Sequence, residues 1–123
     1  MLRKFTKKKF QFSFTPHLSP MFRGILSTIY VDLENNISQT KLLKTLVSFY
    51  KNESFVKILK FGTLLSTNDV INTNNCYISV CKSKYSNKII ILSAIDNLIK
   101  GGAGQAVQNL NNKFNFSETT GLK

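Results

Sequence analysis

The sequence predicts an α+β fold, in which one mixed or mostly antiparallel sheet has helices packed on a face. Five short stretches have the apolar pattern of strands, and two have the three-to-four-residue spacing of helices. Their order, strand, strand, helix, strand, strand, strand, helix, favours a layered single domain. With 123 residues and 42% hydrophobic content, residues 1–123 can bury one core.

Two strands are expected before the first helix. Three phenylalanines alternate with polar residues over 10–14, and Pro16 ends that segment. The second strand is expected over residues 25–33, because alternate positions carry apolar side chains there. We expect one face of this strand to be buried and the opposite face to be partly covered. The first face carries Ile25, Ser27, Ile29, Val31 and Leu33, and the second carries Leu26, Thr28, Tyr30 and Asp32.

The first helix should begin at Ser38 and extend to residue 51, because its apolar residues recur at helical spacing while lysines face outward. Ser38 can cap the first turn, and Ile37 and Leu42 can form a hydrophobic staple around it. Asn52 can close the other end of the helix.

The rest of the chain predicts three strands, a loop and a helix. A short strand is expected over residues 55–59, and residues 67–75 form a polar loop that can bond its own backbone. Residues 77–82 and 88–94 should pair as neighbouring strands. A helix over residues 101–114 ends the predicted fold. Its apolar stripe consists of Ala103, Ala106, Val107, Leu110 and Phe114.

Composition limits the class of function. The net charge of +11 would favour an anionic partner, but the lysines are dispersed and the two arginines are too few for a specialised nucleic-acid surface. No apolar run reaches the roughly 18 residues of a membrane span, and the basic start lacks a secretory signal. Cys76 and Cys81 fit no metal-ligand spacing. We therefore expect a cytoplasmic protein without nucleic acid, membrane or metal as partner.

One loop carries the residues most suited to chemistry. His17, the single histidine, lies between Pro16 and Pro20, which stiffen the backbone around a side chain able to exchange protons near neutral pH. Arg23 could hold an acyl phosphate or a carboxylate with two nitrogens, and Gly24 would let a ligand approach the backbone. From the residues alone, an exposed loop histidine and a surface arginine are also consistent with this pattern.

Glycines at positions 101, 102 and 104 open the last predicted helix, although each glycine inside a helix costs about 1 kcal/mol relative to alanine. Two explanations remain open. The glycines could permit close packing against the preceding strand, or they could expose amides and the positive helix end to a cofactor or anion.

Two motifs in order resemble a known enzyme family. They are T-P-H-L-S-P-M-F-R-G-I-L-S-T-I over 15–29 and D-N-L-I-K-G-G-A-G-Q-A-V-Q-N over 96–109. Together they resemble the N-acetyl-gamma-glutamyl-phosphate reductases of arginine biosynthesis, over residues 14–122 and only about the last third of such an enzyme. The resemblance implies the glyceraldehyde-phosphate-dehydrogenase-like C-terminal fold, whose sheet commonly forms the subunit interface.

The resemblance also implies roles for individual residues. In that family NADPH reduces an acyl phosphate, here N-acetyl-glutamyl phosphate, to a semialdehyde through a cysteine thioester. His17 would be the catalytic acid and base, and Arg23 and Gly24 would bind substrate. Positions near the nicotinamide would be Asn97, Lys100, Gly101, Gln105 and Asn109.

The catalytic cysteine and the NADP-binding Rossmann domain are expected outside this chain. No G-x-G-x-x-G follows a strand-like run, and Cys76 and Cys81 are expected to be small hydrophobic residues, buried or half-buried. The chain should therefore need the N-terminal half of the enzyme, be inactive alone, and form a homo-oligomer through its sheet. Two alternatives are a non-catalytic oligomerisation or regulatory module, and the lysine-pathway N-acetyl-aminoadipyl-phosphate reductase.

Overall fold

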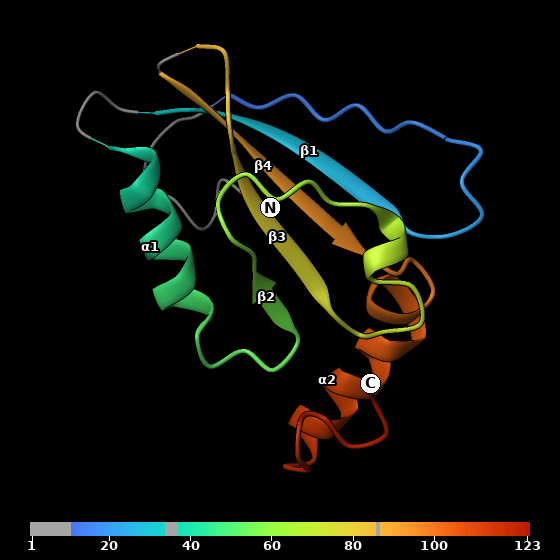
Figure 1. Cartoon of the computed structure of the whole chain (residues 1–123). Helices are drawn as coiled ribbons and strands as arrows, with labels where there is room; N and C mark the ends of the chain where they lie inside the picture. Colours follow the sequence, from blue (N-terminus) through green and yellow to red (C-terminus); the bar gives the residue numbers. More distant parts are fainter. Residues whose placement is uncertain (1–10, 34–36, 86) are drawn as a thin grey trace.

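A computed structural model describes residues 11–33, 37–85 and 87–123, and its architecture is a four-stranded mixed sheet with two α-helices (Figure 1). The strand order is β1–β4–β3–β2. These strands are β1 (Ile25–Asp32), β2 (Val56–Ile58), β3 (Cys76–Lys82) and β4 (Lys88–Ile95). The predicted α+β class is confirmed.

The antiparallel strands β1, β4 and β3 form the main part of the sheet. The pairing of β1 with β4 runs from Ile25 opposite Ile95 to Asp32 opposite Lys88, and the last pair forms a surface ion pair. The predicted pairing of β3 with β4 is confirmed. Strand β2 adds to β3 in the parallel sense, which requires the crossover formed by residues 59–75.

That crossover covers the sheet and forms the core. Leu65 and Val70 pack with Ala94 of β4 in one buried cluster. The segment expected to be a loop contains a short 3-10 helix, Thr67–Asp69, which Ser66 caps. This covering places the end of the crossover beside the C-terminal end of β4.

Helix α1 (Gln39–Tyr50) begins where the sequence predicts. The Ser38 hydroxyl accepts a hydrogen bond from the Lys41 backbone N–H at 3.1 Å. The C-cap is Lys51, one residue before the predicted Asn52. No residue of α1 is buried.

Two strand predictions need correction. Residue 10 lies outside the described residues, and residues 11–15 form no strand, with Phe12 and Phe14 exposed. The alternation of apolar and polar residues is therefore not sufficient to make residues 11–15 a strand. In β1, Ile25 and Ile29 are exposed rather than buried, because the crossover covers β3 and β4 while β1 is an edge strand.

The last helix also differs from its prediction. A π-helical turn, Ile99–Ala103, precedes helix α2 (Gly104–Lys113), and Gly102 within that turn has non-helical backbone angles. Helix α2 buries the polar residues Gln108 and Asn111, whereas Val107, Leu110 and Phe114 of the predicted stripe are exposed. It therefore packs through polar contacts. No helix in the described ranges is long and apolar enough to cross a membrane.

Candidate functional site

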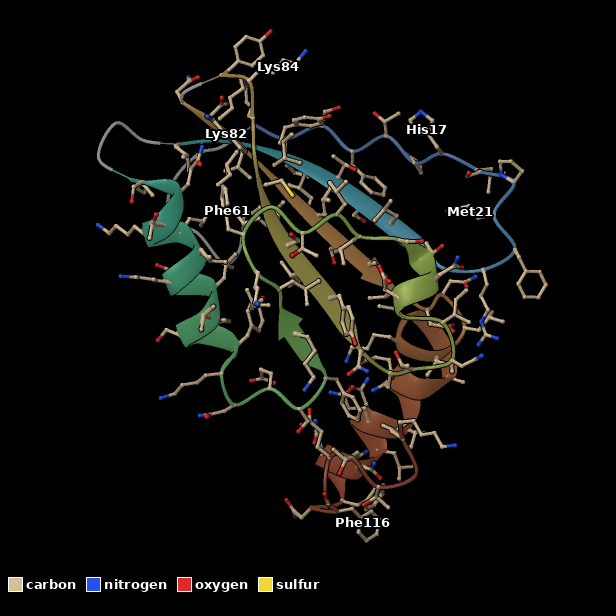
Figure 2. The ribbon with its side chains drawn as sticks, in the orientation of Figure 1. His17, Met21, Phe61, Lys82, Lys84 and Phe116 are labelled. Atoms are coloured by element: carbon tan, nitrogen blue, oxygen red, sulfur yellow. The ribbon has the colours of Figure 1, made fainter. Side chains whose placement is uncertain are left out.

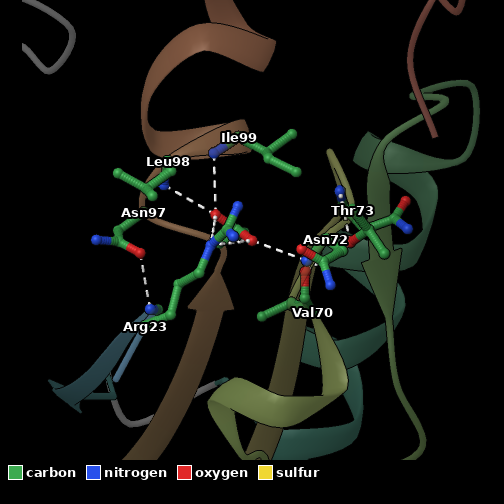
Figure 3. A network of polar contacts seen from close by, with 10 residues as sticks. Arg23, Val70, Asn72, Thr73, Asn97, Leu98 and Ile99 are labelled. Carbon is green, nitrogen blue, oxygen red and sulfur yellow. Dashed lines mark hydrogen bonds and ion pairs between the residues drawn. The ribbon is translucent and has the colours of Figure 1, made fainter. Parts of the chain in front are cut away.

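A buried carboxylate lies just after β4. Asp96 is fully buried, and its Oδ1 accepts hydrogen bonds from the backbone N–H groups of Leu98 at 2.8 Å and Ile99 at 2.9 Å. Its Oδ2 accepts a bond from the Asn72 N–H at 2.8 Å. Asp96 thus joins the end of the crossover to the start of the C-terminal helical segment. Figure 3 shows Leu98 and Ile99 on one side of this network and Asn72 on the other.

Arg23 completes the environment of this carboxylate. Its Nε lies 3.1 Å from Oδ1 and 3.0 Å from Oδ2 of Asp96, and 20% of the arginine side chain remains exposed. Burial alone would raise the pKa of Asp96, but the N–H donors of Asn72, Ile99 and Leu98, together with Arg23, outweigh it and lower that pKa. The carboxylate is therefore held in its charged form.

Gly24 makes a second link beside the first. Its backbone N–H donates to the Asn97 side-chain Oδ1 at 2.8 Å. Gly24 has a φ of +103°, and a Cβ added there would lie 2.6 Å from the Cβ of Thr67. Only glycine fits such a position without a shift of its neighbours. Two consecutive residues before β1 are thus fixed to two consecutive residues after β4.

The glycines after β4 have separate roles. The Gly101 N–H donates to the Asp96 backbone carbonyl at 2.8 Å. At Gly104 an added Cβ would lie 2.5 Å from Oδ1 of Asn74 and 2.6 Å from Cγ2 of Ile99. Close packing therefore explains Gly104. Gly101 and Gly102 lie in the exposed π-helical turn, where the cost of glycine inside an α-helix does not apply.

A polar network lies beneath α2. Gln108 accepts hydrogen bonds through Oε1 from Lys100 Nζ at 2.7 Å and from Asn74 Nδ2 at 2.9 Å. Its own Nε2 donates to Glu118 at 2.7 Å. Lys100 also lies over the Phe55 ring, 5.4 Å from its centroid. Burial lowers the pKa of Lys100 even though nearby acidic groups favour its charge.

The predicted site residues do not all meet. Arg23, Gly24, Asn97 and Gly101 converge around Asp96. His17 is exposed on the outer loop, and its Nδ1 lies 3.1 Å from the Thr15 carbonyl (Figure 2).

The other predicted positions are engaged within the chain or exposed. Among the described residues, no hydrogen bond or ion pair joins His17 to Arg23 or to residues 97–109. Lys100 points to Gln108, while Gln105 and Asn109 bond each other near the surface at 2.9 Å. The structure therefore assembles the arginine side of the predicted site and leaves the histidine apart from it.

Sequence reasoning assigned no role to Asp96, the residue that connects this site. The available signal was an aspartate three residues before the helical segment Ile99–Ala103, where its side chain can accept from free N–H groups. The prediction for both cysteines is confirmed, because Cys81 is buried and Cys76 is half-buried with its Sγ 3.5 Å from the Ser93 hydroxyl. In the described part of the chain, no three His, Cys, Asp or Glu side chains gather to hold a metal ion.

A family model described as "Semialdehyde dehydrogenase, dimerisation domain" matches residues 1–97. The chain belongs to this family. The fold is consistent with that assignment, since the match includes the whole sheet.

Similar proteins agree with the two motifs. One from Thermoanaerobacter pseudethanolicus is 46% identical over 121 residues, which are 98% of this chain and 35% of the relative. One from Desulforamulus reducens is 52% identical over 110 residues, which are 89% of this chain and 32% of the relative. One from Staphylococcus aureus is 48% identical over 110 residues, which again are 89% of this chain and 32% of the relative. All three are named N-acetyl-gamma-glutamyl-phosphate reductase, which confirms the resemblance, and the chain spans about a third of their length.

Proposed function

We propose that the chain is the C-terminal, substrate-side and dimerisation domain of an NADPH-dependent N-acetyl-gamma-glutamyl-phosphate reductase. The observation that carries this proposal is the 46–52% identity to reductases of that name across 89–98% of the chain. In this proposal the NADP-binding domain and a cysteine nucleophile belong to the part of the enzyme that this chain does not span.

The proposed chemistry begins at the acyl phosphate. The cysteine thiolate attacks the carbonyl carbon, phosphate leaves, and a thioester remains. When bound, NADPH would supply the hydride to the thioester carbon. His17 would donate a proton to the oxygen that becomes negative during reduction and take it back as the C–S bond breaks, which releases the semialdehyde and the cysteine thiolate. Arg23 would hold an anionic group of the substrate.

Of the five residues proposed to approach the cofactor, three are accessible to it and two are already engaged in hydrogen bonds within the chain. Gly101 lies in an exposed turn, and Gln105 and Asn109 face the surface side of α2, so these three can meet a nicotinamide. The Asn97 oxygen is engaged by Gly24, and Lys100 by Gln108. These last two therefore support the turn from beneath in this proposal.

A second role as an oligomerisation module has its own support. The matching family model is a dimerisation domain, and edge strand β1 leaves Ile25 and Ile29 about half exposed. A homo-oligomer would cover this strand. This role is compatible with catalysis in a full enzyme, and it would remain if the chain proved to be a non-catalytic module.

Co-assembly tests the proposal. The chain is co-expressed with the N-terminal portion of the Thermoanaerobacter relative, and NADPH oxidation is followed with N-acetyl-glutamyl phosphate and, separately, N-acetyl-aminoadipyl phosphate. We expect turnover of the glutamyl substrate by the complex and none by either part alone. An assembled complex that turns over only the aminoadipyl substrate would reassign the pathway, and one that turns over neither would favour the non-catalytic module.

A further inference from the structure

The guanidinium of Arg23 is held along one edge only. Its Nε contacts both oxygens of Asp96, at 3.1 and 3.0 Å. Within the described residues no hydrogen bond occupies Nη1 or Nη2, and the side chain reaches the surface. An arginine in this state presents two parallel N–H donors, the arrangement that binds a carboxylate or phosphate with two bonds.

Asp96 does not need Arg23 simply to satisfy its hydrogen-bonding capacity. Three backbone N–H groups already donate to its two oxygens, and each lies within 2.9 Å. The contact with Arg23 adds to these three bonds and pairs the negative charge of the buried carboxylate. Its geometric effect is to fix the direction of the guanidinium, since only the Nε edge is engaged.

The backbone of the arginine is fixed as well. The neighbouring Gly24 is tied to Asn97 and fits closely against Thr67. Both ends of the Arg23 side chain, its backbone and its Nε, are thus held by residues around the end of β4. A side chain ordered before binding loses less conformational entropy when a ligand arrives.

We propose that Asp96 is a positioning residue for an oxyanion site, holding Arg23 by its Nε so that Nη1 and Nη2 receive a carboxylate or phosphate group. This inference rests on the proposed function in one respect, namely that the oxyanion belongs to the substrate. Asp96 itself touches no ligand in this arrangement. The shared chemistry of the ligand is a pair of negatively charged oxygens.

Nuclear magnetic resonance of the 15N-labelled chain tests the proposal without turnover. The sequence has two arginines, Arg3 and Arg23, so their Nε–H signals can be assigned by substituting each in turn. We expect the Arg23 Nε proton to exchange with water much more slowly than that of Arg3. Equal exchange rates would overturn the proposal before any ligand is added.

Anion binding provides the second measurement. Inorganic phosphate and acetate are titrated separately at constant ionic strength, and the Arg23 signals are followed. Saturation by phosphate at the lower concentration would assign the site to a phosphoryl group, and the reverse order would assign it to a carboxylate. Absence of saturable shifts with both anions would contradict the proposal.

Matched variants separate positioning from general charge. Asp96→Asn should speed exchange of the Arg23 Nε proton and weaken anion binding about 3- to 10-fold, the range expected when one long side chain must be ordered on binding. Asp32→Asn removes the same charge at an exposed site, and it should change neither the exchange of the Arg23 Nε proton nor anion binding. Unchanged binding and exchange in a folded Asp96→Asn chain would refute the inference.

If Asp96→Asn does not fold, a second variant, Arg23→Lys, still tests the site. Arg23→Lys leaves Asp96 and its three backbone bonds in place but removes the two-nitrogen fork, so it should abolish saturable anion binding. Binding of equal strength in Arg23→Lys would contradict the proposal. Because these readouts need no activity, failure of the reductase assignment would leave them unaffected, and a mobile Arg23 would leave the reductase assignment standing.

Discussion

Removing the Asp96 carboxylate should destabilise the fold more than removal of any surface acid. Asp96→Ala leaves three backbone N–H groups without an acceptor, and Arg23 without its partner. An unsatisfied buried donor costs about 1–3 kcal/mol, and partial access of water to the exposed turn favours the lower value. Three donors then give a loss of about 3–5 kcal/mol in the free energy of unfolding, a large share of the typical 5–15 kcal/mol.

Urea denaturation followed by far-ultraviolet circular dichroism measures this loss. The matched control is Asp32→Ala, since Asp32 is exposed and forms only a surface ion pair with Lys88, expected to contribute about 1 kcal/mol or less. A loss below about 1 kcal/mol for Asp96→Ala would contradict this prediction, because it would mean that water replaces the carboxylate at little cost.

Three further predictions use the same structure. Folding lowers the pKa of Asp96, so its stabilising contribution is complete above the unfolded pKa, near 3.8, and is lost as pH falls through the folded pKa. The urea concentration at the unfolding midpoint should therefore decrease as the pH is lowered below about 4, and it should decrease less steeply in Asp96→Asn. Gly24→Ala should cost about 2–4 kcal/mol by denaturation, because of its positive φ and the 2.6 Å contact, whereas Gly62→Ala, at φ +80° in open space, should cost about 1 kcal/mol. Ile29→Lys on exposed β1 should weaken self-association measured by light scattering, and an unchanged dimer would place the interface elsewhere.

The sequence predicted elements whose pattern is local. Helix α1 and its Ser38 cap follow from helical spacing and one hydroxyl, and β3 and β4 are neighbours along the chain. The phenylalanines at 12 and 14 show the limit of this reasoning, since they alternate with polar residues and yet lie in no strand. Likewise, the buried face of α2 could not be predicted, because Gln108 is buried by distant polar partners rather than by apolar periodicity.

The candidate site was predictable in part for the same reason. Motifs singled out Arg23, Gly24 and Asn97, but the contacts that join them span 73 residues and depend on the register of β1 with β4. Nothing local in the sequence fixes that register. Asp96 therefore remained without a role until the strands were paired.

In the proposed enzyme His17 supplies the acid and base, and a comparison of turnover tests this role. Turnover of N-acetyl-glutamyl phosphate is compared between co-assembled enzymes carrying the original chain and His17→Asn, with the same amount of complex verified by size-exclusion chromatography. We predict that His17→Asn lowers kcat about 100-fold or more, because proton transfer is lost while the loop is retained. Equal turnover by the two complexes would contradict the account.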